Sequence, residues 1–118
     1  KRNAWEQMFT LNDFNTPLSK EEAGEYQVAL EMLRLAPSAT NAQPWAVVKE
    51  GNHFHFFCNY KNSISEDMKK IKHLDLGIAL AHFHQTAMGE GLSGELGVKE
   101  INFDVPENMH YVLTYTSK

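Results

Sequence analysis

The stretch Pro37-Ser-Ala-Thr-Asn-Ala-Gln-Pro-Trp45 lies between a helical pattern and two strand-like runs, so it marks the change from helix to sheet. Its two prolines fix the backbone angle φ, and its small residues let another molecule come close. Asn41 and Gln43 can each donate and accept hydrogen bonds. These properties predict a loop that holds a flat polar ligand. The alternative is a tight connection in which both amides satisfy only their own backbone.

The residues before this loop predict helices. Ser19 and Glu22 have the spacing of a capping box, and apolar residues then recur at helical intervals, so a helix is predicted over residues 20–35. Pro37 ends it. Further upstream, the spacing of Trp5, Met8 and Phe9 predicts a short amphipathic helical turn that docks an aromatic surface onto a neighbour.

The residues after the loop predict a β-hairpin. Two runs rich in β-branched and aromatic residues, 45–49 and 53–60, are separated by Glu50-Gly51-Asn52. Alternation along the second strand places two phenylalanines on one face and two histidines with a third phenylalanine on the other. The residues of the two faces are Phe54 and Phe56, and His53, His55 and Phe57.

Residues 71–88 give the strongest helical pattern of the chain. Apolar residues surround most of this helix, which predicts a central, largely buried helix that packs against a sheet and a partner. Gly89 and Gly91 are expected to end it through left-handed conformations. Strands are predicted over 92–98 and 111–116, joined by a turn over 104–108. The predicted fold is α+β, with a small, mainly antiparallel sheet packed with helices around this long central helix.

The nine-residue loop resembles the PSxxNxQPW segment of the FMN-dependent nitroreductase family. Trp5-Glu-Gln-Met-Phe9 and Phe14-Asn-Thr-Pro-Leu18 look like the lead-in of those family members that contain two related halves in one chain. The segment from His73-Leu-Asp-Leu-Gly-Ile-Ala-Leu80 to Gly91-Leu92 looks like the long central helix of the family. The resemblance implies one nitroreductase-like domain over residues 1–118, corresponding to the C-terminal half of a longer chain.

The resemblance also implies a cofactor site. In the family, this loop lies against the isoalloxazine and ribityl part of an FMN bound by the partner subunit or partner half, and the matching contact residues here are Pro37, Ser38, Ala39 and Asn41. Ala39 stands where many relatives have a second serine. Gln43 and Trp45 are expected to brace the loop. The Arg- and Ser-rich segment that grips the flavin phosphate in the family is not present in these 118 residues, so that contact is expected from the other half.

The implied activity is that of an FMN-dependent NAD(P)H oxidoreductase that reduces nitroaromatic or quinone-like acceptors. This chain would supply one wall of a flavin site between two halves or subunits, with the missing N-terminal half or a second copy, as in a homodimer, as its partner. The isolated piece is expected to be inactive, and no catalytic side chain is identified because the flavin carries the chemistry. The alternatives are a flavin-free scaffold for dimerisation or ligand sensing, and another flavin reaction such as enoate reduction or dehalogenation.

Composition excludes several other classes of function. The net charge of −4 and the scattering of 11 basic residues among 15 acidic ones argue against a nucleic-acid-binding surface. No apolar run reaches the ~20 residues of a membrane span. Cys58 is the only cysteine, so no internal disulfide can form, and a reducing cytoplasm is expected.

Two further motifs are interpreted as structural. Gly89, Gly91 and Gly94 spell GxGxxG, but they close a helix and lead into a strand, whereas a dinucleotide fingerprint follows a strand and opens a helix. His53 and His55 share a strand face without a third ligand at metal-binding spacing, so no metal site is predicted.

Overall fold

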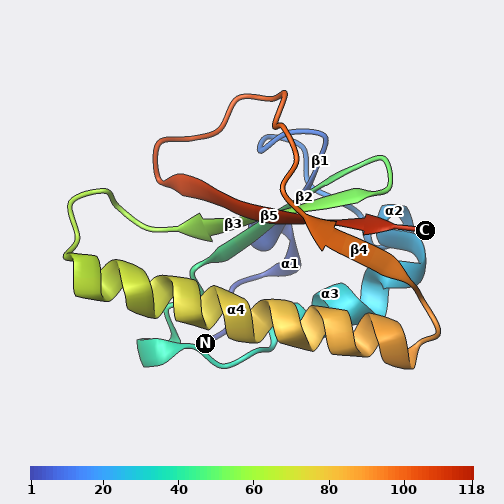
Figure 1. Cartoon of the computed structure of the whole chain (residues 1–118), viewed down its shortest axis with the longest axis horizontal. Helices are drawn as coiled ribbons and strands as arrows, with labels where there is room; N and C mark the ends of the chain where they lie inside the picture. The colour runs from blue at the N-terminus through green and yellow to red at the C-terminus, as the bar shows by residue number, and fades with distance from the viewer.

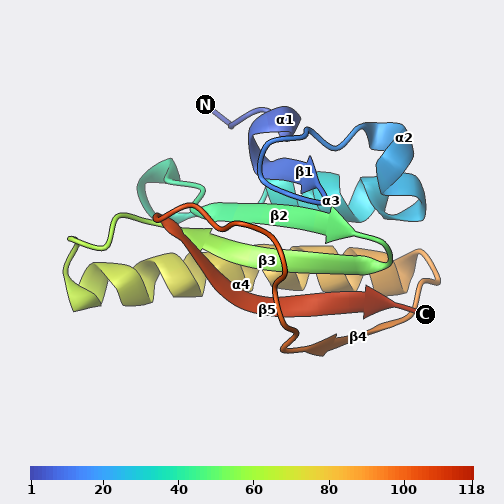
Figure 2. The same ribbon diagram turned by 90° about the horizontal axis from the view of Figure 1, so that it is seen from above.

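A computed structural model describes the whole chain, residues 1–118. One five-stranded sheet carries helices α3 and α4 on one face, while the segment between β4 and β5 crosses the other face (Figures 1 and 2). In chain order the elements are α1 Trp5–Met8, β1 Phe9–Leu11, α2 Lys20–Ala23, the 3₁₀ turn η1 Gly24–Tyr26, α3 Gln27–Arg34, the 3₁₀ turn η2 Ala39–Asn41, β2 Trp45–Glu50, β3 His53–Asn59, α4 Glu66–Gly89, β4 Gly94–Gly97 and β5 Met109–Ser117.

The sheet has the strand order β1-β2-β3-β5-β4. The hairpin β2–β3 pairs antiparallel, as do β3–β5 and β4–β5, so the predicted α+β fold with a mainly antiparallel sheet is confirmed. Strand β1 was not predicted, and it pairs parallel to β2 with Phe9 opposite Val47. A strand of three residues is too short for an alternation of apolar and polar residues to be recognised in the sequence. The side chain of Phe9 is buried and forms an edge-to-face pair with the Trp5 ring. The predicted turn of helix is confirmed for Trp5 and Met8, which lie in α1, but Phe9 belongs to β1. The expectation that this aromatic surface docks onto a neighbour was wrong, because Trp5 and Phe9 are buried within the chain itself.

The prediction of one continuous helix over residues 20–35 was wrong. The chain forms α2, η1 and α3 instead, and the break falls at Gly24, whose φ of 58° lies in the left-handed region that glycine tolerates. The capping box at the start is confirmed: the Ser19 hydroxyl accepts from the Glu22 N–H at 3.0 Å, and the Glu22 carboxylate accepts from the Ser19 N–H at 2.8 Å.

Helix α4 begins five residues earlier than predicted. The Ser65 hydroxyl caps it by accepting the Met68 N–H at 3.1 Å. At the other end, the Leu92 N–H donates to the Ala87 carbonyl and the Gly91 N–H to the Met88 carbonyl, which is the hydrogen-bond pattern of a Schellman motif. Gly91 has the left-handed φ of 79° that this motif needs, whereas Gly89 is still helical, so the prediction was right for one glycine only.

The core lies between the sheet and the helices. Leu76, Ala79, Phe83 and Ala87 of α4 are buried in one cluster with residues of α3 and the sheet. The ring of Phe83 lies within 6 Å of four other aromatic rings, those of Tyr26, Phe54, Phe56 and Tyr115. Only this face of α4 is buried in the chain, so the expectation of a helix that is largely buried was wrong for the chain alone.

The predicted alternation along β3 is confirmed. Phe54, Phe56 and Cys58 belong to the main core, whereas Phe57 belongs to a second cluster on the opposite sheet face. There, Phe103 of the segment between β4 and β5 packs against Phe57 and His55. The last two strands differ from the prediction in length. Strand β4 is shorter than the predicted range 92–98, and β5 is longer than the predicted range 111–116.

Candidate functional site

The predicted ligand loop joins the end of α3 to the start of β2 and lies beside the N-terminal half of α4 (Figure 1). Pro37, Ala39, Thr40 and Asn41 are exposed, and Ser38 is half-buried. All four predicted contact residues therefore stand within one short surface segment.

The backbone of this loop is strained. Thr40, Asn41 and Gln43 have φ angles of 51°, 56° and 49°, in the left-handed region that residues other than glycine rarely adopt. The conformation costs roughly 1–2 kcal/mol per residue, and a β-branched threonine is an unusual occupant. Contacts elsewhere must hold the loop in this shape, and such over-determined strain is typical of functional sites.

Gln43 supplies many of these contacts. The residue is 4% exposed. Its Nε2 donates to the Lys1 carbonyl at 2.9 Å and to both the backbone carbonyl and the side-chain oxygen of Asn41 at 3.2 Å. Its Oε1 accepts the Asn3 N–H at 2.7 Å, and its own backbone N–H donates to the Ser38 hydroxyl at 2.9 Å. The prediction that Gln43 braces the loop is confirmed.

Trp45 lies at the end of the loop with its ring in the core. It is 2% exposed, which is consistent with a bracing role, but its indole Nε1 has no hydrogen-bond partner in the chain. A buried indole N–H usually has an acceptor.

A residue that sequence analysis did not single out holds the loop from the helix side. Asp75 of α4 is 4% exposed, and both of its carboxylate oxygens lie 3.2 Å from the Ala39 nitrogen, whose N–H they accept. An acidic residue between Leu74 and Leu76 in the most apolar helix of the chain was the signal that could have identified it.

The polar groups of the predicted contact residues are partly engaged within the chain. The Asn41 side chain donates to the Lys1 carbonyl at 2.8 Å, and the Ser38 hydroxyl accepts from Gln43. By contrast, the backbone N–H groups of Ser38 and Thr40 have no acceptor in the chain. The loop therefore offers two free backbone donors on an exposed surface.

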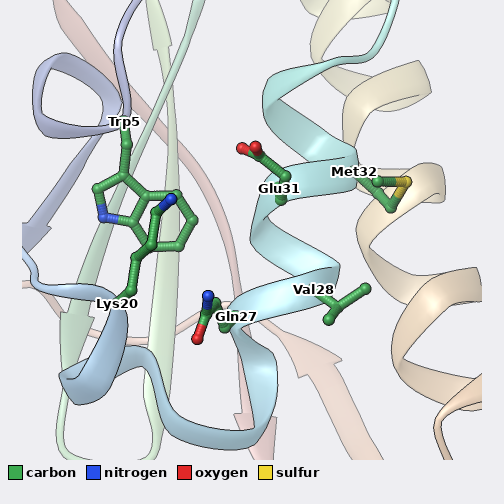
Figure 3. Close-up of a pocket in the computed structure, with 6 residues that line it drawn as sticks. All are labelled: Trp5, Lys20, Gln27, Val28, Glu31 and Met32. Carbon is green, nitrogen blue, oxygen red and sulfur yellow. The ribbon is translucent and has the colours of Figure 1, made fainter.

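The hollows of the molecule lie elsewhere. One of about 160 Å³, between α1, α2 and α3, is lined by Trp5, Lys20, Gln27, Val28, Glu31 and Met32 (Figure 3). In it the Lys20 ammonium lies 5.6 Å from the centroid of the Trp5 ring. Two further hollows lie around Gly24 and Gly51 and around Leu96 and Lys99. None of the three hollows includes a residue of the loop. A flat ligand on the loop would need a second surface to enclose it.

The histidines do not converge on a metal site. His55 is buried, and its ring nitrogens face the Thr114 hydroxyl at 2.7 Å and the Glu50 carboxylate at 3.0 Å. Burial lowers the pKa of His55, and the nearby Glu50 carboxylate opposes that shift. His53 instead contacts Thr116. No group of three or more His, Cys, Asp or Glu side chains is placed to hold a metal ion.

Comparison with known proteins identifies the family. The family model described as "Putative TM nitroreductase" matches residues 11–87, which is more than half of the chain and includes the loop and most of α4. No curated protein matched the chain, and neither did any solved structure. None of its helices is long and apolar enough to cross a membrane. The chain belongs to this nitroreductase family.

Proposed function

We propose that the full-length protein is an FMN-dependent oxidoreductase that uses NADH or NADPH to reduce nitroaromatic or quinone-like acceptors. The observation that carries this proposal is the strained, exposed loop inside the region that matches the nitroreductase family. A simple connection would not need three left-handed residues without a glycine.

The chemistry of the loop fits one wall of a flavin site. The edge of an isoalloxazine ring carries carbonyl oxygens and ring nitrogens, which are partners for backbone donors such as the free N–H groups of Ser38 and Thr40. Pro37, Ser38, Ala39 and Asn41 are the residues proposed to contact it. When bound, the flavin would supply the two-electron chemistry between the nicotinamide and the acceptor. The loop would contribute binding and orientation.

The outer face of α4 supports a partner for this wall. Six exposed residues, which we call the α4 seam, recur at alternating intervals of three and four, the a/d spacing of a helix that packs along another helix. They are Ile71, Leu74, Ile78, Ala81, Gln85 and Met88. Leu74 is 65% exposed and Met88 58% exposed, which is unusual for such large apolar side chains in a regular row.

The loop and the α4 seam are neighbours. Asp75, which binds the loop, follows Ile71 by four residues and precedes Ile78 by three, so the three side chains adjoin on the helix surface. A partner that covers the seam would therefore also approach the loop. We propose that this partner is a second copy or the N-terminal half of a longer chain, and that the flavin lies where the two surfaces meet.

A flavin-free scaffold is the second candidate. The Asn41 side chain already has two partners, Lys1 and Gln43, and no hollow exists at the loop. A dimerisation or ligand-sensing module would share both features, because neither requires a cofactor.

The experiment is an FMN titration of the full-length protein, monitored by flavin fluorescence, with NADPH-dependent bleaching of the flavin absorption as the activity readout. The Asn41→Ala variant should weaken flavin binding by about 1–3 kcal/mol if its amide is a buried partner of the ring. Asn102→Ala is the control, because Asn102 is exposed and belongs to the segment on the other sheet face. A full-length protein that binds no flavin and bleaches none would favour the scaffold instead.

A further inference from the structure

Asp75 is the only carboxylic acid among the buried residues of the chain. The Ala39 N–H is its one hydrogen-bond donor, shared between the two carboxylate oxygens. A buried carboxylate normally needs several donors to compensate for the loss of water, so a single backbone N–H leaves it poorly satisfied. Leu76 and Ala79, on the same helix, are buried in the apolar core. The stability of the fold would be served at least as well by an apolar residue at position 75.

Ala39, the hydrogen-bond partner of Asp75, lies at the start of the strained segment of the loop. Ala39 is the first residue of η2 and immediately precedes the left-handed residues Thr40 and Asn41. Gln43 fixes the other end of the strained segment through Ser38, Asn41 and the N-terminal residues. Asp75 thus provides the link between this segment and the rigid framework of α4.

We propose that Asp75 is a positioning residue for the flavin site. Its carboxylate accepts the Ala39 N–H and thereby holds the loop at a fixed distance from α4. The N–H groups of Ser38 and Thr40 then remain available to a ligand. This inference rests on the proposed function. Asp75 touches neither the cofactor nor the acceptor; it acts through Ala39.

Two variants with the same number and branching of side-chain non-hydrogen atoms separate positioning from fold stability. Asp75→Asn keeps an oxygen that can accept the Ala39 N–H, whereas Asp75→Leu keeps the branching and removes the acceptor. Because burial of a poorly paired carboxylate is costly, Asp75→Leu should leave the thermal midpoint unchanged or raise it. If Asp75 had a purely structural role, the same substitution would lower the thermal midpoint.

The first readout needs no flavin. Hydrogen exchange and the ¹H–¹⁵N spectrum report the Ala39 amide directly in the 118-residue chain. Asp75→Leu should accelerate exchange at Ala39 by about tenfold or more, and Asp75→Asn by less, as expected for the loss of a hydrogen bond to a charged group. Asp67→Asn, which removes an exposed carboxylate from the first turn of α4, is the control.

The second readout is FMN affinity and the absorption spectrum of the bound flavin in the full-length protein. Asp75→Leu should weaken binding by about tenfold to a hundredfold, with partial recovery in Asp75→Asn. Unchanged exchange at Ala39 in Asp75→Leu would overturn the inference, and so would normal flavin affinity and spectrum after the Ala39 contact is lost. A wild-type protein that binds no flavin would refute the proposed function and this role for Asp75, while the Ala39 readout would still decide whether the contact exists.

Discussion

The α4 seam makes a quantitative prediction about assembly. Leu74 is 65% exposed, more than Ile71, Ile78 or Met88 of the seam. Complete burial of a leucine stabilises a folded or assembled state by about 1.5–3 kcal/mol. Covering the exposed part of the side chain should therefore contribute ~1–2 kcal/mol per copy, and about twice that in a symmetric dimer. Leu74→Lys removes this gain and adds the cost of burying a charge, so it should weaken self-association by at least about thirtyfold.

Sedimentation velocity over a wide concentration range of the 118-residue chain is the assay, because a second copy is then the only available partner. Val98→Lys is the matched control: Val98 is 79% exposed and apolar but lies outside the seam. Its association should equal that of the wild type. The reasoning is refuted if Leu74→Lys associates as tightly as the wild type. A wild type that stays monomeric at the highest concentrations would refute a second copy as the partner of the seam and would leave the N-terminal half as the proposed partner.

Two further predictions concern stability. Gly94→Ala should destabilise the fold by about 1–3 kcal/mol, because an added Cβ would overlap the ring of Tyr115. Gly97→Ala on the same strand is the control, because its added Cβ meets nothing within 4 Å and should change stability little. Denaturant unfolding compares the two variants. His55 should make the free energy of unfolding fall on acidification, because burial holds the pKa of His55 in the folded protein below the ordinary 6.5. The contribution of neutral His55 to stability is complete above pH 6.5 and is lost as the pH falls from there through the folded pKa. Thermal midpoints between neutral pH and about pH 5 should depend less on pH in His55→Gln than in the wild type, whereas exposed His82→Gln should keep the wild-type dependence.

The local features of the fold could be predicted because neighbouring residues determine them. The capping box at Ser19, the hairpin around Gly51 and the two faces of β3 all depend on sequence spacing of a few residues. Gly24 was harder to interpret, because a glycine inside an apolar helical pattern is often tolerated at a cost of ~1 kcal/mol. Here its positive φ breaks the helix, a choice that tertiary packing makes.

The candidate site could be predicted only in part for the same reason. The loop residues are contiguous, so their position in the sequence already groups them. Asp75 lies 36 residues after Ala39, and their contact exists only because α4 folds back beside η2. The parallel pairing of β1 with β2 is likewise a long-range event, which no local pattern in three residues encodes.

The position of Asp75 links assembly to the proposed ligand site. On one side its carboxylate holds Ala39, and on the other it adjoins Ile71 and Ile78 of the α4 seam. A partner packed on that seam would remove water from the surroundings of Asp75 and strengthen its hydrogen bond to Ala39, since electrostatic interactions grow as the local dielectric falls. The strained conformation of Thr40 and Asn41 would then be held most firmly in the assembled protein. Flavin affinity should accordingly fall in Leu74→Lys even though Leu74 belongs to the helix and not to the loop.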